Sequence, residues 1–287
     1  MAYRLLGSLS EAEDAVQEGY ARWYALSSGR RAQVSSPTAW LTTVVSRICL
    51  DMLGSARARR ERYVGPWLPE PLSADATKWT SLANSATGND PLDRVSLHES
   101  VSLALLTVLE RLTPAERVAF VLHDIFAYPF AEIAEITGRN PGACRQLASS
   151  ARHRVQADAR TQVSSTDLAR TVEAFKAAWE TGDVAGLISQ LATEATATID
   201  GGGKVSAATV PLTDREQIAH FFLDVHQRQP DLVIREAVIS GSSGLTAHDS
   251  AGHTLATISF ALRGRLISDI WVMRNPDKLT TWIGDDL

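Results

Sequence analysis

The chain has 287 residues, of which 45% are hydrophobic and 21% charged, and its net charge at pH 7 is −5. This ordinary globular composition excludes wholesale disorder, collagen and disulfide scaffolds, and the length predicts two or three domains. The sequence has no apolar run of ~18–20 residues, no signal peptide and no metal-ligand spacing of its two cysteines. We therefore expect a cytoplasmic protein with no metal, no other cofactor and no membrane partner.

The charge is unevenly distributed. Residues 161–287 carry 10 Lys+Arg and 16 Asp+Glu, whereas residues 1–160 carry 18 and 17. Within the first half, segments 44–62 and 139–160 each hold five arginines. Two short basic segments on a nearly neutral background indicate two separate contacts with a polyanion.

The apolar periodicity predicts helices first and strands later. We expect a helix from residue 11 with Ser10 as its N-cap, then a polar loop over 27–37 and a helix from Pro37 to residue 62. The Pro-rich segment 64–92 is interpreted as a linker and not as a packed element. Further helices are predicted at 93–111, 114–126, 129–137, 141–158, 167–183 and 215–226, and strands at 195–200, 232–239, 244–249, 253–262 and 266–273. This order indicates a separate α+β domain at the C-terminal end.

Segment 130–156 has the spacing of a helix–turn–helix. Gly138 is expected to end one helix, Asn140 to cap the next and Pro141 to take its first position. The second helix would enter a DNA major groove, where arginine pairs with guanine. Its candidate base-reading residues are Arg145, Gln146, Ser149 and Arg152. The alternative is an ordinary solvated basic helix.

The other basic segment combines arginines with an aromatic residue. Basic and aromatic side chains together suit unpaired DNA, whose extruded bases can stack. An arginine run alone more commonly marks a solvated helix end or a general phosphate contact. The residues concerned are Arg30 and Arg31 in the polar loop and Trp40, Arg47, Asp51, Arg57 and Arg60 on the following helix.

These segments resemble a known family. The sequences AYRLLGSLSEAEDAVQEGYARW and SPTAWLTTVVSRICLDMLGSARARRERY resemble the sigma-2 region of extracytoplasmic-function (ECF) RNA polymerase sigma factors, and LERLTPAERVAFVLHDIFAYPFAEIAEITGRNPGACRQLASSARHRVQ resembles their sigma-4 region. The motifs WLPEP (67–71), DGGGK (200–204) and NPDKL (275–279) are similar to those of the ECF41 (SigJ-like) subgroup, whose members carry a SnoaL-like C-terminal extension. In the family a longer first helix precedes AYRLLGS.

The resemblance implies a multidomain protein with two all-α sigma domains and an α+β NTF2/SnoaL-like cone. The expected ranges are 1–65 for sigma-2, 66–92 for the linker, 93–160 for sigma-4 with its helix–turn–helix, and 167–287 for the SnoaL-like domain. Asp14, Gln17 and Glu18 match the helix that binds the polymerase clamp. The basic segment near Arg47 matches the part that melts and reads the minus-ten element, and the helix carrying Arg145 matches the reader of the minus-thirty-five element.

The C-terminal domain could be an enzyme or a regulator, because its fold serves both. Its acid–base candidates are Asp200, His220, Asp224, His226, His248 and Asp269. All five tyrosines lie at or before position 128, so the domain lacks the tyrosine donor that ketosteroid isomerase, a known example of this chemistry, uses. A non-enzymatic role is therefore favoured.

The three short motifs have a different interpretation. Consecutive glycines allow a close backbone approach, and prolines hold a segment extended at low entropy cost. We expect the domain to hold the linker and to regulate promoter binding, in place of a separate anti-sigma factor; the alternative for DGGGK is a plain β-turn. The residues assigned to this contact are Trp67, Leu68, Pro69, Glu70, Pro71, Asp200, Gly201, Gly202, Gly203, Lys204, Asn275, Pro276 and Asp277.

The expected function is therefore that of an alternative sigma factor, with bacterial core RNA polymerase and promoter DNA as partners. One rival is a SnoaL-like isomerase or small-molecule-binding domain with a DNA-binding appendage. The other is a helix–turn–helix regulator whose C-terminal pocket senses an unknown small ligand. Tight duplex binding without polymerase would distinguish that regulator from a sigma factor.

Overall fold

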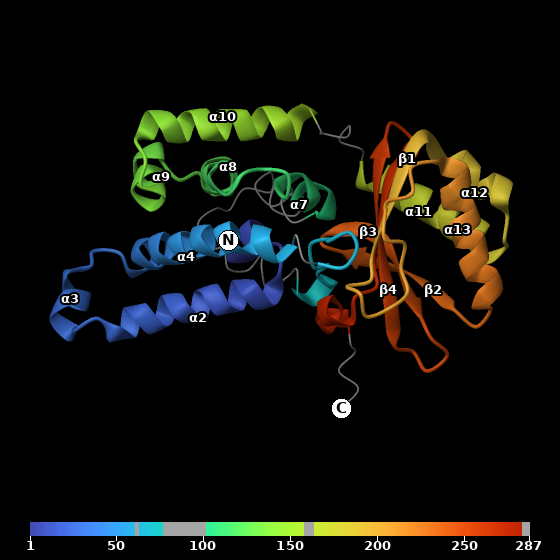
Figure 1. Cartoon of the computed structure of the whole chain (residues 1–287), viewed down its shortest axis with the longest axis horizontal. Helices are drawn as coiled ribbons and strands as arrows, with labels where there is room; N and C mark the ends of the chain where they lie inside the picture. Colours follow the sequence, from blue (N-terminus) through green and yellow to red (C-terminus); the bar gives the residue numbers. More distant parts are fainter. Residues whose placement is uncertain (61–62, 77–101, 158–163, 283–287) are drawn as a thin grey trace. The chain divides into compact units, whose positions relative to one another are not determined.

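A computed structural model describes residues 1–60, 63–76, 102–157 and 164–282, with the side chains of 56–60 and 157 left out. The chain divides into two compact units, one formed by 1–62 with 106–158 and the other by 63–105 with 159–287 (Figure 1). Among the described residues no helix combines the length and apolarity needed to cross a membrane. Most of the linker predicted at 66–92, and the part of the predicted helix before residue 102, lie outside the described residues.

The first unit is helical. Two expectations for its N-terminal part are wrong. The N-cap of the second helix is Ser8, whose extended backbone lets its Oγ accept the Glu11 N–H at 3.4 Å, so Ser10 lies inside the first turn. The expected polar loop also contains a short helix, capped by Ser27. The helices are α1 Ala2–Leu6, α2 Leu9–Ala25, α3 Ser28–Gln33, α4 Pro37–Arg60, α7 Leu103–Leu109, α8 Pro114–Phe120, η1 Val121–Ile125, α9 Phe130–Thr137 and α10 Pro141–Ala157; α7 begins in the second unit.

The parts that resemble sigma-2 and sigma-4 pack together within this unit, through α4 against α8 and α9. Arg117 of α8 is 3% exposed and donates through Nη1 to the Leu5 carbonyl at 3.0 Å and to Glu110 at 2.7 Å. The guanidinium of Arg4 lies 4.9 Å from the centre of the Phe126 ring. Burial lowers the pKa of each of these two arginines to about 10. Cationic side chains thus join the two parts.

The second unit confirms the expected α+β domain. Its sheet has the order β1-β5-β4-β3-β2, with β1 parallel to β5 and the other pairs antiparallel. Helix α12 was not expected from the sequence, and β1 begins at Leu191, earlier than expected. The elements are α11 Ser165–Glu180, α12 Val184–Gln190, β1 Leu191–Asp200, α13 Arg215–Arg228, β2 Val233–Ile239, β3 Ser242–His248, β4 Thr254–Arg263, β5 Leu266–Met273, η2 Pro276–Lys278 and η3 Thr280–Trp282.

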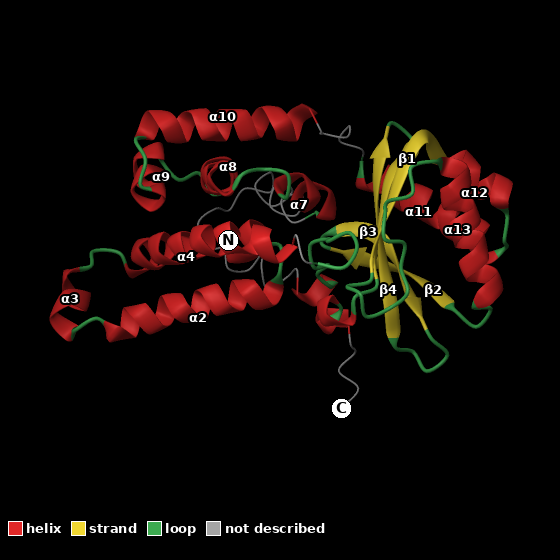
Figure 2. Cartoon of the chain, in the orientation of Figure 1, coloured by secondary structure: helices red, strands yellow, loops and turns green. Residues whose placement is uncertain are grey.

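Both faces of the sheet are covered. The three helices lie on one side (Figure 2), where Phe175 and Phe222 pack edge to face at 5.0 Å in the main core. On the other side Leu68 of the predicted linker joins Trp271 and Leu279 in a second cluster. Leu68 is 3% and Leu72 0% exposed, so this part of the segment is a packed element, contrary to expectation. Burying its leucines requires a partner, which the outer face of the sheet supplies.

Candidate functional site

The helix–turn–helix has the boundaries that the sequence predicts. Gly138 ends α9 in the left-handed conformation with φ 66°, and Pro141 begins α10. The Asn140 Oδ1 accepts the Ala143 N–H at 2.8 Å and so caps α10. Cys144 is buried. Gly138, Asn140 and Pro141 therefore determine where α9 ends and where α10 begins.

The predicted base-reading residues differ in their surroundings. Arg145, Gln146 and Ser149 are exposed on α10. Arg152 is half-buried and forms an ion pair with Asp124 of η1, with Nε 2.8 Å from Oδ1. Three of the four predicted side chains therefore face solvent, and the fourth is paired within the unit.

A buried glutamate holds α10 against α8. Glu116 forms a capping box with Thr113 at the start of α8 and accepts the Ser150 hydroxyl at 2.8 Å and Arg154 Nη1 at 3.2 Å. Burial raises the pKa of Glu116, but the hydrogen bonds from Thr113 and Ser150 and the charge of Arg154 outweigh burial and lower it overall. This side of α10 is thereby fixed against α8.

The residues predicted to bind polymerase all lie exposed on α2. They are Asp14, Gln17 and Glu18, and Glu18 also accepts Arg22 Nε at 2.8 Å. The two carboxylates can accept hydrogen bonds from a partner, the Gln17 amide can both donate and accept, and all three side chains lie outside the core.

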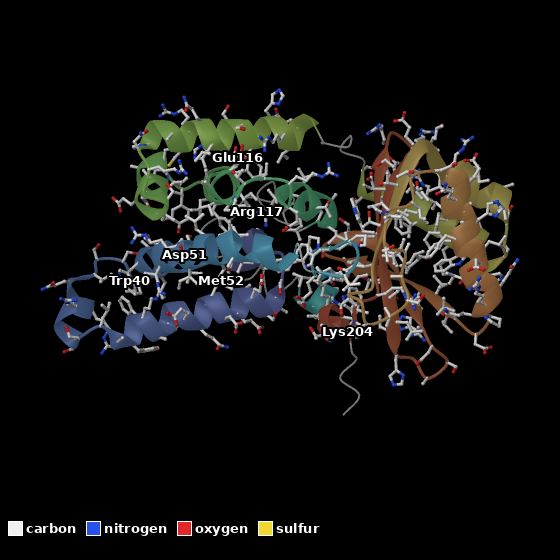
Figure 3. The ribbon with its side chains drawn as sticks, in the orientation of Figure 1. Trp40, Asp51, Met52, Glu116, Arg117 and Lys204 are labelled. Atoms are coloured by element: carbon white, nitrogen blue, oxygen red, sulfur yellow. The ribbon has the colours of Figure 1, made fainter. Side chains whose placement is uncertain are left out.

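The predicted minus-ten residues are spread over α3 and α4. Trp40 and Asp51 lie on α4 (Figure 3), and the Trp40 ring contacts that of Trp23 with 5.1 Å between their centres. Arg47 is exposed but donates through Nη2 to the Glu135 carbonyl of α9 at 2.7 Å. Arg30 and Arg31 belong to α3, and the side chains of Arg57 and Arg60 lie outside the described residues.

The three short motifs meet at the buried carboxylate of Asp200, which ends β1 and is 0% exposed. Its Oδ1 accepts the Tyr63 hydroxyl at 2.6 Å and the Gly202 N–H at 3.0 Å. Its Oδ2 accepts the Leu68 N–H at 2.9 Å and Lys278 Nζ at 2.8 Å. One carboxylate thus joins the linker, the glycine motif and the NPDKL motif.

Lys278 provides the positive charge that pairs with the Asp200 carboxylate. Its ammonium lies 4.2 Å from the centre of the Trp67 ring and 4.8 Å from that of Tyr63, and it donates to the Leu68 carbonyl at 2.7 Å. Asn275 Nδ2 donates to the Tyr63 hydroxyl at 2.8 Å. Burial, together with the hydrogen bond to the Asp200 carboxylate, raises the pKa of Tyr63 above its ordinary value. The aromatic rings and the carboxylate therefore stabilise a lysine that is only 10% exposed.

The glycine motif allows close approach. Gly201 opens a turn in which its carbonyl accepts the Lys204 N–H at 3.0 Å. Gly202 and Gly203 have φ of 60° and 68°, and a Cβ on Gly203 would lie 2.9 Å from the Val64 Cβ of the linker. A Cβ on Gly202 would collide with Asn275. The motif therefore forms a turn, and its glycines also approach Asn275 and Val64 closely.

The last predicted members pair with each other. Lys204, labelled in Figure 3, is exposed and forms an ion pair with Asp277 in the short helix η2 that Pro276 begins. This pair links DGGGK to NPDKL at the surface. Since both side chains are more than half exposed, 52% and 61%, it contributes little stability.

The rest of the linker is held mainly through its backbone. The Leu72 N–H donates to Ser240 Oγ at 3.0 Å and the Leu72 carbonyl accepts the Ser240 N–H at 2.8 Å. The Pro71 carbonyl accepts Trp282 Nε1 at 2.9 Å. Glu70 and Pro69 are buried in this segment. We call segment 63–72 and its partners Asp200, Ser240, Asn275, Lys278 and Trp282 the linker clasp.

Sequence reasoning missed several members of the linker clasp. Tyr63 precedes WLPEP, and Lys278 lies inside NPDKL but was not assigned a role. Ser240 was invisible because its contribution depends on a tight turn with φ 48°, rare for a residue other than glycine. A buried aspartate at a strand end needs a cation, and this requirement was the signal that could have identified Lys278.

The remaining acid–base candidates do not form a second centre. His248 is buried and lies 2.8 Å from Thr246 Oγ1, and Asp269 accepts the Thr196 hydroxyl at 3.0 Å. Asp224 pairs with Arg228 on α13, the helix that also carries His220 and His226. The described residues contain no cluster of three or more side chains suited to hold a metal ion.

A small apolar pocket lies between α13 and the sheet. Arg274 is the one ionisable residue in its described lining, and burial lowers the pKa of that guanidinium. Arg274 is engaged with the Ser206 carbonyl at 2.6 Å. The pocket is lined by Trp179, Phe221, Phe222, Val225, Gln229, Leu232, Ala247, Leu255, Ala256, Ile258, Val272 and Arg274.

Comparison with known proteins identifies the family. The sequence matches "Sigma-70 region 2" over residues 1–59 and "Sigma-70, region 4" over residues 102–155. It is 39% identical to the ECF RNA polymerase sigma factor SigJ of Mycobacterium tuberculosis strain H37Rv, over 98% of this chain and 89% of SigJ. This chain belongs to the ECF RNA polymerase sigma factors.

Solved structures agree with this assignment. The crystal structure of M. tuberculosis SigJ matches this ECF sigma factor with a TM-score of 0.72 and 35% identity, over 98% of this chain and 93% of that chain. A SnoaL-like protein of unknown function from Burkholderia thailandensis E264 covers 39% of this chain and 95% of its own, with 16% identity and a TM-score of 0.32. The expected sigma-2 and sigma-4 regions are confirmed, and they are followed by the C-terminal α+β domain that the sequence predicts.

Proposed function

We propose that this sigma factor directs core RNA polymerase, in the cytoplasm, to promoters with a minus-thirty-five element read by α10 and a minus-ten element melted and read by α3 and α4. We also propose that its SnoaL-like domain is a fused regulator. By holding the linker, that domain sets how far the sigma-2 and sigma-4 regions can separate, and a separate anti-sigma factor is not needed.

The promoter part of the proposal is supported by the exposed residues of α10 and α4. Arg145 is positioned to reach a major groove, since the cap at Asn140 fixes the helix that carries it. Arg47 and Asp51, one turn apart on α4, share an exposed face. The two basic segments therefore belong to separate elements, as contacts with two promoter elements require.

The regulatory part rests on one observation, the Asp200 network. A fully buried carboxylate is costly unless it is paired and hydrogen-bonded, and Asp200 receives two of its four hydrogen bonds from the linker residues Tyr63 and Leu68. Removing the linker would leave Asp200 and Lys278 with fewer partners. The domain is therefore built to contain the linker, as a regulator that acts through the linker would be.

The same network argues against catalysis by the SnoaL-like domain. Asp200 is the most deeply buried acid–base candidate, and Lys278 and the Leu68 amide occupy its second oxygen. A general base must reach a substrate proton, and this carboxylate faces the linker. The apolar pocket offers Arg274 as its one ionisable described residue, and an arginine does not act as a general base at neutral pH.

The test is run-off transcription with purified bacterial core polymerase on the promoter of the factor's own gene. The full chain is compared with Asp200→Ala and with Lys176→Ala, a control that removes an exposed ion pair elsewhere in the same domain. We expect transcripts that require core polymerase, a changed yield with Asp200→Ala and an unchanged yield with Lys176→Ala.

Other outcomes favour the rivals. Tight binding of the chain alone to duplex promoter DNA, with no core-dependent transcript, would indicate a conventional helix–turn–helix regulator. Transcription that is equal for all three proteins would keep the sigma factor and remove the regulatory role. Turnover of a small substrate that is lost with Asp200→Ala would establish a pocket enzyme.

A further inference from the structure

Two arginines of the recognition helix are held by side chains from outside it. The guanidinium carbon of Arg145 lies 5.5 Å from the centre of the Phe130 ring, within the range of a cation–π contact. The Phe130 ring also packs against His123, with 3.9 Å between ring centres and an interplanar angle of 28°. The three side chains form a stack across η1, α9 and α10.

The base of this stack is itself fixed. His123 Nδ1 lies 3.0 Å from the Tyr128 carbonyl, which can only accept, so Nδ1 carries the hydrogen. The backbone around it turns back sharply, with Ala127 at φ 55° and the Tyr128 N–H bonded to the Leu122 carbonyl at 2.9 Å. The π-helical turn η1 thus carries the His123 ring that packs against Phe130.

The next residue of the same turn holds the second arginine. Asp124 Oδ1 accepts both Nε and Nη2 of Arg152, and the carboxylate is 20% exposed. An arginine reads guanine through a fork of two N–H groups. In Arg152 one such edge is already taken by Asp124, whose charge also offsets the attraction to DNA. Arg145 is different, because no described residue accepts a hydrogen bond from it.

We propose that Arg145 reads a base pair of the minus-thirty-five element from a position set by the His123–Phe130 stack, whereas Arg152 is a positioning residue that fastens α10 to η1 through Asp124. The proposal rests on the proposed function and revises it at one point, since Arg152 no longer reads a base. Phe130 and Asp124, which touch no DNA in this scheme, become determinants of specificity and of helix placement respectively.

The experiment uses the full chain with core polymerase. Holoenzyme first selects its preferred sequence from a fully randomised duplex, and each variant holoenzyme is then bound to that duplex and to every single-base-pair substitution in the upstream element. The variants are Arg145→Ala, Phe130→Leu, Phe130→Tyr, Arg152→Ala and the double variant Phe130→Leu/Arg145→Ala. Thermal unfolding of each variant checks that it remains folded.

We expect Arg145→Ala to abolish the preference at one or two base pairs, a loss of about 10- to 100-fold in discrimination. Phe130→Leu should weaken the preference at the same base pairs, Phe130→Tyr should restore it, and the double variant should match Arg145→Ala. Arg152→Ala should lower the affinity for every duplex by one common factor and leave the preferences unchanged.

Two results would overturn the proposal. One is the loss of preference at a particular base pair with Arg152→Ala, which would make Arg152 a base reader. The other is an unchanged preference with Phe130→Leu at the position where Arg145→Ala removes it. If the unaltered holoenzyme enriches no sequence at all, the proposed function itself fails; if it does enrich one, only the positioning scheme is in question.

Discussion

The Asp200 carboxylate shows how a single side chain can determine the position of a segment more than a hundred residues away. It is 0% exposed and receives hydrogen bonds from Tyr63, Leu68, Gly202 and Lys278. Breaking a buried ion pair by removing one partner is strongly destabilising because the other charge stays buried. The charge of Asp200, more than its volume, therefore holds the linker clasp together.

Replacing Asp200 by Asn tests this directly. The shape is kept, but Lys278 loses its counter-charge, and we expect a loss of about 3 kcal/mol, near the lower end for broken buried pairs. For a unit of this size that corresponds to a melting temperature lower by roughly 6–12 °C. Thermal unfolding followed by near-ultraviolet circular dichroism measures it.

Lys204→Ala is the matched control. It removes an ion pair of the same domain that is more than half exposed on both sides, and such pairs contribute at most about 1 kcal/mol. Equal shifts in Asp200→Asn and Lys204→Ala would show that burial of the charge has no special role in the linker clasp.

Among the elements, α8 and α10 are joined by a glutamate with two tasks. Glu116 caps α8 through Thr113 and binds Ser150 and Arg154 on α10. Because hydrogen bonds and the Arg154 charge lower its pKa below 4.5, its ionised form is favoured more in the folded than in the unfolded chain. The stability it contributes is present above pH 4.5 and is lost as the pH falls through its lowered folded pKa.

We expect Glu116→Gln to preserve the cap, since glutamine serves at this position, and to remove the charge. At pH 7 hydrogen exchange in α10 should be faster than in the unaltered chain, by an amount corresponding to about 1–2 kcal/mol. As the pH falls from 4.5 through the lowered pKa of folded Glu116, the two proteins should converge. Glu132→Gln, a change at an exposed residue of α9, should have no effect at either pH; a difference that persists at low pH would contradict the assignment to charge.

The sequence predicted best those elements whose ends are encoded locally. Gly138, Asn140 and Pro141 each act within one or two residues, and the turn they form is where it was expected. Helix α2 was misplaced at its start because Ser8 and Ser10 both satisfy the composition of an N-cap, and only the backbone conformation of Ser8 decides between them. The short helix α3 lies in a polar segment without apolar periodicity, so no pattern revealed it.

The motifs that form the candidate site were predictable from the sequence, but the residues that make its hydrogen bonds and ion pairs were only partly predictable. Motif resemblance brought WLPEP, DGGGK and NPDKL together, but the partners that make the contact, Lys278 and Ser240, depend on pairings 78 and 168 residues apart in sequence. Likewise Arg152 was predicted to read a base, whereas it pairs with Asp124, 28 residues earlier. Apolar periodicity and capping residues describe local structure, so they do not reveal contacts between residues far apart in the sequence.

At the scale of the whole molecule, the chain leaves the first unit after residue 62 and returns to it at residue 106. The segment 63–105 between these points belongs to the second unit, together with the C-terminal domain. The segment follows the sigma-2 region and precedes most of the sigma-4 region, and its residues 63–72 are held by the linker clasp.

We expect Trp67→Ala to release this segment in part, because the ring beneath Lys278 is removed. The radius of gyration measured by small-angle scattering should increase, and the Leu68 and Leu72 amides should exchange faster. Lys176→Ala should leave both quantities unchanged. An unchanged radius together with unchanged exchange would show that the linker clasp does not restrain the sigma-2 region.

The linker clasp grips its segment chiefly by the main chain: the amide and carbonyl of Leu68, the carbonyl of Pro71, and the amide and carbonyl of Leu72. Every residue except proline offers the same two groups, so these main-chain contacts restrict the sequence of the segment less than the side-chain contacts of Tyr63, Trp67 and Leu68 do. The residues that hold the segment tolerate fewer substitutions, because they act through their side chains. They are Asp200, Ser240, Lys278 and Trp282. Substitutions should therefore be tolerated best at positions of the segment that contribute only main-chain groups, and least at Tyr63, Trp67 and the four residues that hold the segment.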